Sequence, residues 1–495
     1  MLFTSIPFLF FFLLVFFLYW FVFNRSVGVQ NLFLLFSSYF FYSWFDWKYS
    51  ILLISISLAN YLIALLIQKM NHPFHRKLMF ISGLMINIGT LVIFKYFNFF
   101  IGSFAKLIAY AGFNPNHFIL NVILPLGISF YIFLSISYIV DVYQRKLKAV
   151  TNLTDVLLAF SFFPIILAGP IHRPLGLLPQ IQSKRIFKSD FASAGLKQIL
   201  WGAFMKILIA DQCAVYVNSI FSNVSILSGS TLMIGVILFT IQIYADFAGY
   251  SHMAIGISRL LGFSIMQNFN YPYFSRDIRE FWKRWNISLT TWFRDYVFLP
   301  VAYKVSRQIK SERVLGVKTD FIIYFTGLLV TWLLTGLWHG ANYTFIIWGL
   351  IQGLFLMLYH ISIKPRKRFL KRVQVNNENK ALIIVEYLVT LAIIMVSWIF
   401  FRAGNIHEAW LYCSRVFSGS LFSMPNIELL DGIAGPLAFI GVFFMVEWFG
   451  RKNDFPMAEL GLRWPKVLRW SVYYLMAIAI FWYSGNHQQF IYFQF

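Results

Sequence analysis

The chain has 495 residues, of which 59% are apolar and only 12% are charged. Aromatic residues make up 20% of the chain, and the mean hydropathy is +0.69. A soluble domain carries about 25% charged residues and has too little interior to bury so much apolar surface. The composition therefore excludes a soluble enzyme, a secreted module and a disordered regulator. Continuous apolar runs of about 20 residues instead predict an all-α polytopic membrane protein.

The net charge is +22, and the basic residues cluster in short loops between the apolar runs. Cytoplasmic loops of membrane proteins carry an excess of lysine and arginine. The charge therefore indicates membrane topology, and we expect no binding of nucleic acid. The richest loop is 364–380; another holds Lys304, Arg307, Lys310, Arg313 and Lys318. Neither Cys213 nor Cys413 fits a disulfide framework or a metal site.

Taken in chain order, the apolar runs predict twelve spans in one membrane domain over 1–495. They are 6–23, 31–45, 50–67, 79–100, 118–143, 195–222, 231–258, 321–338, 343–363, 381–401, 433–449 and 467–485. The run 31–45 is the shortest, so we expect 11–12 spans. A further apolar segment, 155–171, has basic residues on both sides, at 145–148 and 173–188. Crossing the membrane would place one basic group outside, so we predict that 155–171 is re-entrant.

The segment 277–302 mixes tryptophans with arginines. It is too charged to span the membrane and too apolar to be a free loop, so we expect an interfacial or re-entrant pair of amphipathic helices. Arg284 and Arg294 could clamp a phosphate-bearing donor through paired hydrogen bonds, with Trp285 beside them. A belt of tryptophan and arginine at the membrane interface is the alternative.

His339 stands between two adjacent apolar runs, in the sequence Trp338-His339-Gly340. Gly336 and Gly340 remove side chains on either side of it, which allows another molecule to approach closely. Counting basic loops places His339 toward the outer half of the membrane. An imidazole with a pKa of about 6.5 can take a proton near neutral pH. A catalytic base is one interpretation, and a hydrogen-bonded structural histidine in a turn is the other.

Gln242, Asp246 and Tyr250 are spaced four residues apart and share one face of the helix expected over 231–258. Asp246 falls near mid-membrane, where a carboxylate needs a partner or water. It could orient a catalytic histidine, pair with a cation or carry ions, and a buried structural pair is the alternative. The outer loop 402–432 is interpreted as an amphipathic cover or a solvated loop. We found no sequence motif for ATP hydrolysis, redox cofactors or zinc proteolysis.

Together these stretches resemble the membrane-bound O-acyltransferase (MBOAT) family. The likeness is to its bacterial branch, which serves alginate O-acetylation and teichoic-acid D-alanylation. The stretches that carry the resemblance are Gln242–Ser251, Asn270–Tyr273, Phe281–Trp285, Trp292–Asp295 and Gly336–Gly340, with Ala168–Ile171 and Phe490–Phe495. The resemblance covers nearly the whole chain.

The resemblance implies a ring of tilted helices around a central funnel or tunnel, with re-entrant helices. It implies an O-acyltransferase of the bacterial inner membrane, with His339 as the essential base. The donor would be a cytoplasmic thioester, acetyl-CoA or an acyl carrier protein, with no tightly bound cofactor. Besides the lipid bilayer, the partners would be a periplasmic acetyltransferase and an extracytoplasmic polysaccharide. D-alanyl transfer to teichoic-type polymers and a non-catalytic acyl transporter or scaffold remain as alternatives.

The chain departs from the family pattern at Asn286, where relatives commonly carry a second histidine. Asparagine donates and accepts hydrogen bonds but is no base at neutral pH, so the resemblance assigns the base role to His339 alone. Asn286 and the Trp338 N–H could stabilise an oxyanion. Asp246 or Tyr250 could orient the imidazole.

Overall fold

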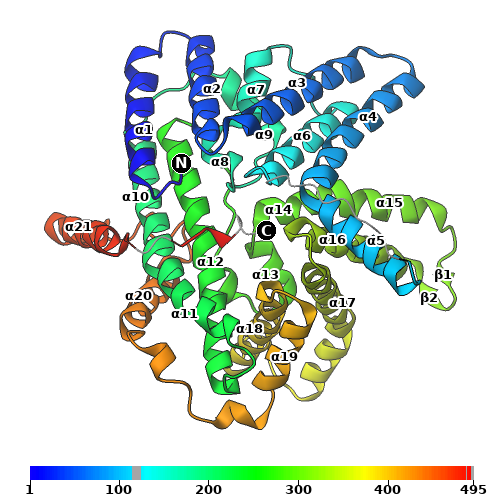
Figure 1. Ribbon diagram of the computed structural model, residues 1–495, viewed down its shortest axis with the longest axis vertical. Coiled ribbons are helices and arrows are strands. Elements are labelled where there is room, and N and C mark those ends of the chain that lie inside the picture. Colours follow the sequence, from blue (N-terminus) through cyan, green and yellow to red (C-terminus); the bar gives the residue numbers. More distant parts are fainter. Residues whose placement is uncertain (114–123, 486–487, 492–495) are drawn as a thin grey trace. The chain divides into compact units, whose positions relative to one another are not determined.

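The computed structural model describes residues 1–113, 124–485 and 488–491. Its regular structure is almost entirely helical (Figure 1). Seven helical segments in the described residues are long and apolar enough to cross a membrane: Trp47–Lys69, Pro73–Tyr110, Ser189–Ser222, Gly229–Leu260, Thr319–His339, Tyr343–Arg372 and Lys380–Arg402. Shorter apolar helices are Ile6–Val22, Ile128–Tyr143 and Ala434–Gly450. The all-α membrane class is therefore confirmed.

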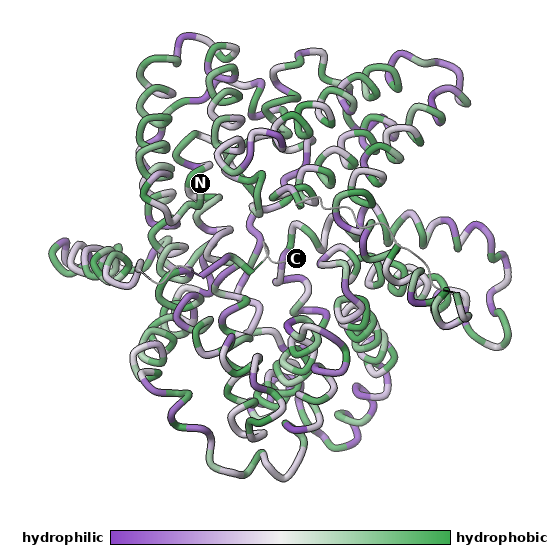
Figure 2. The backbone as a smooth tube through the Cα atoms, in the orientation of Figure 1, coloured by the Kyte–Doolittle hydropathy of each residue, from purple (hydrophilic) through white to green (hydrophobic). Residues whose placement is uncertain are grey.

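Every predicted span falls on a helix, although residues 118–123 of one lie outside the described residues. Figure 2 shows the reason: apolar residues run along whole helices, and hydrophilic residues gather at helix ends and in loops. Side chains that face outward are also apolar, such as Phe10 at 68% and Phe21 at 72% exposure. A water-soluble surface does not look like this, whereas a lipid-facing one does.

The chain folds into two compact units, residues 1–199 with 250–266, and residues 200–249 with 267–495. The helices of the first unit are α1 (Ile6–Phe17), η1 (Leu18–Val22), α2 (Val27–Ser43), α3 (Trp47–Lys69), α4 (Pro73–Leu91), η2 (Val92–Tyr96), α5 (Phe97–Tyr110), α6 (Ile128–Tyr143), α7 (Leu153–Ser161), α8 (Phe163–Ile166) and α9 (Pro174–Gln182). Two helices, α10 (Ser189–Phe204) and α12 (Gly229–Leu260), contribute residues to both units.

The predicted re-entrant segment 155–171 is broken in the structure. Helix α7 has nine residues and is followed by the four-residue α8 and by non-helical chain. Nine residues of α-helix rise about 14 Å, less than half of a hydrocarbon core of about 30 Å. This helix is too short to cross a membrane by itself, as the re-entrant prediction requires.

Arg185 is one of the basic residues that flank that segment. Its side chain is buried at 5% exposure. The guanidinium donates to the Tyr19 hydroxyl at 2.9 Å and to the Asn31 side-chain oxygen at 2.6 Å. Asn31 in turn donates to Asp155 at 2.9 Å. Because a buried arginine needs several acceptors, this network ties η1, α2 and α7 of the first unit together.

His172 also lies inside the first unit, in the non-helical chain between α8 and α9. Its Nδ1 accepts a hydrogen bond from the Met266 amide at 3.4 Å. Burial lowers the pKa of His172 to about 4, so the ring is neutral at physiological pH.

The second unit holds most of the motifs that carry the resemblance, whereas Ala168–Ile171 and the end of Gln242–Ser251 belong to the first. Its elements are η3 (Met205–Ala210), α11 (Asp211–Ser222), η4 (Pro272–Phe274), α13 (Ile278–Arg284), α14 (Ile287–Phe293), η5 (Arg294–Phe298), α15 (Leu299–Gln308), β1 (Arg313–Val314), β2 (Val317–Lys318), α16 (Thr319–His339), α17 (Tyr343–Arg372), α18 (Lys380–Arg402), α19 (Ile406–Val416), η6 (Gly419–Phe422), η7 (Glu428–Leu430), α20 (Ala434–Gly450) and α21 (Lys466–Tyr483). In the loop 402–432, α19 buries Tyr412 and Val416 against α11 and α12, so the apolar face of this helix packs on these two helices.

Candidate active site

His339 is the last residue of α16, at a tight turn into α17. The turn is fixed by Asn342, whose side chain caps α17 through the Thr344 amide at 3.1 Å. The two helices approach closely because glycines stand at the points where they meet. A β-carbon at Gly336 would overlap the carbonyl oxygen of Phe345, and one at Gly340 would overlap the Phe345 ring. The glycines beside His339 thus serve helix packing, and they hold the histidine at a defined position between two spans.

Aromatic rings surround the imidazole of His339, which is 4% exposed. Its centroid lies 4.8 Å from those of Trp338 and Trp348 and 5.1 Å from that of Phe401. All three rings stand at 75° to 84° to the imidazole plane. Edge-to-face contact is the favoured geometry for aromatic pairs. The site therefore gives His339 apolar walls that keep its ring in one orientation.

The segment 277–302 forms the short helix α13 and, after a break at Trp285 and Asn286, a second helical stretch that runs through α14 and η5 into α15. Asp277 caps α13 through the Glu280 amide at 2.8 Å. Asn286 adopts left-handed backbone angles, φ 42° and ψ 55°, and its side chain makes no capping hydrogen bond. Asparagine tolerates this conformation better than most residues. Two helical stretches are thus present, as predicted, and Asn286 occupies the bend between them; their interfacial or re-entrant position stays a prediction.

The bend is held by the non-helical segment before it. The Ile287 amide donates to the Asn268 carbonyl at 2.8 Å. The Asn268 side-chain oxygen accepts from the Ser288 hydroxyl, also at 2.8 Å. Downstream, the Tyr271 hydroxyl donates to the Gly450 carbonyl at 2.9 Å. Burial raises the pKa of Tyr271, so this phenol stays protonated and keeps its donor. Asn286 is therefore placed by contacts on both sides, and it is 2% exposed.

Tryptophans join the bend to the histidine turn. Trp285 packs against Trp398 on α18, with centroids 5.1 Å apart, and Trp398 stacks on Trp348 at 6.0 Å. Trp348 in turn contacts His339. The two motifs, which are about fifty residues apart in the sequence, thus belong to one aromatic cluster in the second unit.

The alternative of an interfacial tryptophan belt is wrong for this segment. Trp282, Trp285 and Trp292 are 6%, 1% and 4% exposed. The Trp282 indole N–H donates to the Gln352 side chain on α17 at 3.1 Å. An indole buried against other helices needs such a partner, whereas one in an interfacial belt finds water.

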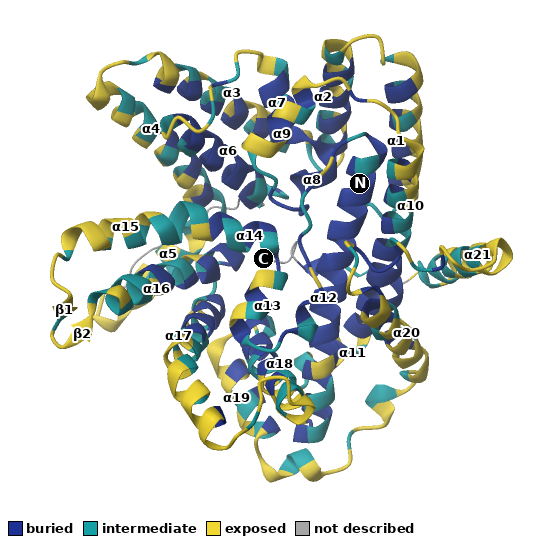
Figure 3. Cartoon of the chain, turned by 180° about the vertical axis from the view of Figure 1, so that it is seen from behind, coloured by how far each residue is buried: buried dark blue, intermediate teal, exposed yellow. Residues whose placement is uncertain are grey.

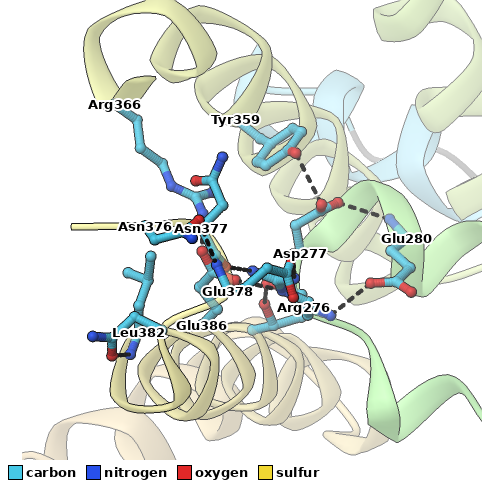
Figure 4. Close-up of polar contacts among 12 residues, drawn as sticks. Arg276, Asp277, Glu280, Tyr359, Arg366, Asn376, Asn377, Glu378, Leu382 and Glu386 are labelled. Atoms are coloured by element: carbon cyan, nitrogen blue, oxygen red, sulfur yellow. Dashed lines mark hydrogen bonds and ion pairs between the residues drawn. The ribbon is translucent and has the colours of Figure 1, made fainter. Parts of the chain in front are cut away.

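A polar network fixes the start of α13 (Figure 4). Arg276 donates through Nε to Glu386 on α18 at 2.7 Å, and Arg366 on α17 also bonds to Glu386. The Tyr359 hydroxyl donates to Asp277 at 2.8 Å. A cleft of about 360 Å³ lies against this network. Carboxylates and cations, Lys367 among them, line the cleft together, so its charge favours neither anions nor cations.

The two arginines expected to bind the donor differ in their surroundings. Arg284 is held by the Glu280 carboxylate on the same helix at 2.7 Å and by the Asn270 carbonyl at 3.2 Å. Arg294 pairs with its neighbour Asp295 at 2.7 Å, and its side chain is 60% exposed. Arg284 is thus engaged in supporting the bend. Arg294 presents more of its guanidinium to the outside.

The structure does not bring Asp246 to His339. One oxygen of Asp246 pairs with Lys206 at 2.8 Å, and the other accepts from the Ile491 amide at 2.7 Å. Lys206 also pairs with Asp211 at 2.7 Å. Sequence reasoning missed Lys206 and Asp211, although a lysine inside the apolar run 195–222 was a signal for a buried partner.

The structure also places Trp338, Tyr250 and Gln242, which the sequence singled out. Trp338 lies against the imidazole, as described. Tyr250 belongs to the first unit, where its ring stacks on Phe3 at 4.7 Å. Gln242 is buried on α12. In the part of the chain that the structure describes, no group of three or more His, Cys, Asp or Glu side chains could hold a metal ion.

The model of the MBOAT, membrane-bound O-acyltransferase family matches residues 142–401. That range includes both the bend at Asn286 and the turn at His339.

Curated relatives come from several bacteria. A probable alginate O-acetylase AlgI of Pseudomonas putida is 33% identical over the full length of both chains. Another, of Pseudomonas syringae, is 36% identical over 87% of this chain and 77% of its own. A peptidoglycan O-acetyltransferase of Helicobacter pylori is 30% identical over 83% of this chain and 78% of its own. The chain therefore belongs to the membrane-bound O-acyltransferase family and is a multi-pass membrane O-acyltransferase.

Proposed function

We propose that this protein passes an acetyl group from a cytoplasmic thioester toward the hydroxyl groups of an extracytoplasmic polysaccharide, with a periplasmic acetyltransferase as partner. The observation that carries the proposal is the position of His339, at a turn between two spanning helices and inside aromatic walls. The names of the relatives, which include alginate and peptidoglycan O-acetylating proteins, support acetyl as the acyl group and a polysaccharide as the final acceptor.

The reaction needs one base that later acts as an acid. A nitrogen of the His339 imidazole takes the proton of an acceptor hydroxyl, and the hydroxyl oxygen forms a bond to the thioester carbonyl carbon. The oxyanion of the tetrahedral intermediate is stabilised by N–H donors, for which Asn286 and Trp338 are the candidates. The carbon–sulfur bond then breaks, and the imidazolium returns the proton to the thiolate. The products are an ester and a free thiol.

The apolar walls around His339 favour this use of the ring. They hold the ring in one orientation, with Trp338, Trp348 and Phe401 edge to face against it. A neutral imidazole is the form that accepts a proton. General base catalysis of this kind contributes about 10²- to 10⁴-fold to a rate.

The side from which the donor arrives follows from the basic loops, and its binding residue from the exposure of two arginines. The basic loop 364–380 belongs on the cytoplasmic side by the excess of lysine and arginine, and acetyl-CoA or an acylated carrier protein would arrive there. Both arginines expected to hold it pair with a carboxylate, but the side chain of Arg294 is 60% exposed against 29% for Arg284, so Arg294 is better placed to meet an anion. Arg294→Ala should raise the KM for acetyl-CoA, whereas Arg284→Ala should reduce the amount of folded protein first.

The decisive experiment compares His339→Ala with His360→Ala in bacteria that make an O-acetylated polymer. His360 lies on α17, is exposed and stacks on Tyr324, which makes it a matched control. The measured quantity is acetate released by alkali from alginate, peptidoglycan or teichoic-type polymers. His339→Ala should abolish acetylation at normal protein levels, and His360→Ala should leave it intact. Normal acetylation by the His339→Ala protein would leave only a transporter or scaffold role. Alanine in place of acetate would indicate D-alanyl transfer.

A further inference from the structure

The loop that joins α15 to α16 is folded into a small β-hairpin. Its strands, β1 and β2, pair antiparallel, with Arg313 opposite Lys318 and Val314 opposite Val317. The Ser311 hydroxyl donates to the Arg313 carbonyl at 2.6 Å, which braces the base of the hairpin. The tip therefore stands on a defined support.

The residue at the tip is unusual for its position. Leu315 and Gly316 have φ angles of 49° and 80°, and a two-residue hairpin loop with two positive φ angles favours asparagine followed by glycine. Leucine adopts such angles only at a cost in backbone energy. Its side chain is 99% exposed, so it gains no packing inside the chain in return. A strained and fully exposed apolar residue calls for a contact outside the chain.

Cations surround this apolar tip. The stretch 299–318 carries five lysines and arginines against a single carboxylate, Glu312. Lys310, Arg313 and Lys318 are exposed, and within the described residues no salt bridge neutralises them. Figure 3 shows the hairpin and most of α15 exposed. The contact outside the chain is therefore with something that is apolar and negatively charged.

The position of the hairpin identifies that partner. Helix α16, a candidate span, begins at Thr319, the residue after β2. The hairpin thus lies where a span enters the membrane, and its excess of basic residues assigns it to the cytoplasmic side. Anionic lipids attract juxtamembrane cations there, and an apolar side chain among cations is typical of insertion at the headgroup boundary.

We propose that the hairpin 310–318 is a membrane anchor, which inserts Leu315 into the cytoplasmic leaflet and binds anionic lipid headgroups through Lys310, Arg313 and Lys318. Because the same helix carries His339 at its other end, the anchor fixes the depth of the candidate active site from the opposite end of α16.

The test uses the full-length protein in vesicles of phosphatidylcholine, with or without phosphatidylglycerol. An environment-sensitive fluorophore is attached at Leu315→Cys in a Cys413→Ala background; Cys213 is buried. The emission should shift to shorter wavelength, and brominated lipid chains should quench it, more strongly when phosphatidylglycerol is present. A fluorophore at Lys371→Cys, on the exposed end of α17, should emit at the wavelength typical of an aqueous environment in both kinds of vesicle.

Two sets of variants then separate the apolar and the charged contributions, with the fluorophore moved to Val317→Cys. Leu315→Asn fits the turn better than leucine, so loss of quenching in this variant cannot come from unfolding of the hairpin. The triple variant Lys310→Glu, Arg313→Glu and Lys318→Glu should lose the effect of phosphatidylglycerol. Reversing Lys367, Lys371 and Arg372 to glutamate should preserve it.

Water-like emission from position 315 in both vesicles would overturn the proposal. So would a response that requires an added acidic protein, for which purified acyl carrier protein is the probe, because the hairpin would then be a protein-docking site. Neither result would bear on His339, since polymer acetylation is measured separately.

Discussion

His339 and Trp348 meet edge to face, with ring centroids 4.8 Å apart and an angle of 84° between their planes. Trp348 is fully buried and also contacts Trp282, Trp332 and Trp398. The imidazole therefore rests on a ring that is itself held from three sides, and Trp348 is a positioning residue for the proposed base.

Replacing this ring tests the relationship. Trp348→Phe should lower kcat by about 2- to 10-fold, since an aromatic pair of this kind contributes about 0.5–1.5 kcal/mol, and it should leave the KM for the donor unchanged. Trp332→Phe is the matched control, because Trp332 belongs to the same cluster and packs on Trp282 at 4.5 Å. Equal losses in the two variants would mean that only the packing of the cluster matters.

Asn286 allows a test that separates conformation from chemistry. Asn286→Gly keeps the left-handed backbone without strain, whereas Asn286→Ala adds about 1–2 kcal/mol. If the amide binds an oxyanion, both variants should lose similar activity, and only alanine should lower the melting temperature. Asn286→His should be tolerated, because histidine is also enriched at positive φ. Full activity of the glycine variant would remove Asn286 from the proposed reaction.

The buried cluster of Lys206, Asp211 and Asp246 predicts a large effect on stability. Lys206→Met leaves two carboxylates without their cation, which costs about 3–5 kcal/mol for a buried pair. Thermal unfolding in detergent should show a much lower midpoint, and adding Asp246→Asn should restore part of it. Lys452→Met, at an exposed position of the same unit, should change nothing. An unchanged midpoint for Lys206→Met would contradict the ion pairs.

His172 predicts a pH dependence of stability. Its pKa is about 4 in the folded protein and about 6.5 when unfolded, so the unfolded state binds more protons between these values. Stability should fall as the pH drops from about 6.5 to 4, by at most about 1.4 kcal/mol per pH unit, and level off below. His172→Gln should flatten the profile between these pH values. His407→Gln, at an exposed site, should leave it unaltered.

The re-entrant segment can be tested by chemical labelling. Single cysteines at Lys148 and Lys184, both exposed, should react with an impermeant maleimide only from the cytoplasmic side. Reaction of either one from outside would show that 155–171 crosses the membrane.

The spans were predictable because hydropathy is a local property, and each run of apolar residues had to become a helix in lipid. The two helical stretches within 277–302 were also predictable from the mixed composition of that segment. Whether its tryptophans face lipid or protein was not, since Trp282 and Trp285 are buried by α16 to α18, far away in the sequence. A helix whose tryptophans face lipid and one whose tryptophans face protein can have the same composition, and only tertiary packing distinguishes the two.

In the candidate site, too, some features could be predicted from the sequence and others could not. His339 stood out because its chemistry and its glycines are adjacent in the sequence. The partner of Asp246 did not, since an ion pair between Lys206 and Asp246 depends on how α12 lies against η3. Asp246 was expected to need a partner, and the sequence shows Lys206 inside an apolar run. No local sequence pattern, however, identifies which of the many cations pairs with Asp246.

The contact between Asp246 and Ile491 has a consequence for biosynthesis. The two residues are 245 positions apart in the chain, so the ribosome releases Asp246 into the membrane long before Ile491 exists. At about 5–20 residues per second, the interval is tens of seconds. During that time the backbone donor of Ile491 is missing, and Lys206 is the cation already present that can pair with the carboxylate. The ion pair between Lys206 and Asp246 is therefore available before the segment that completes the hydrogen bonding of Asp246 has been made.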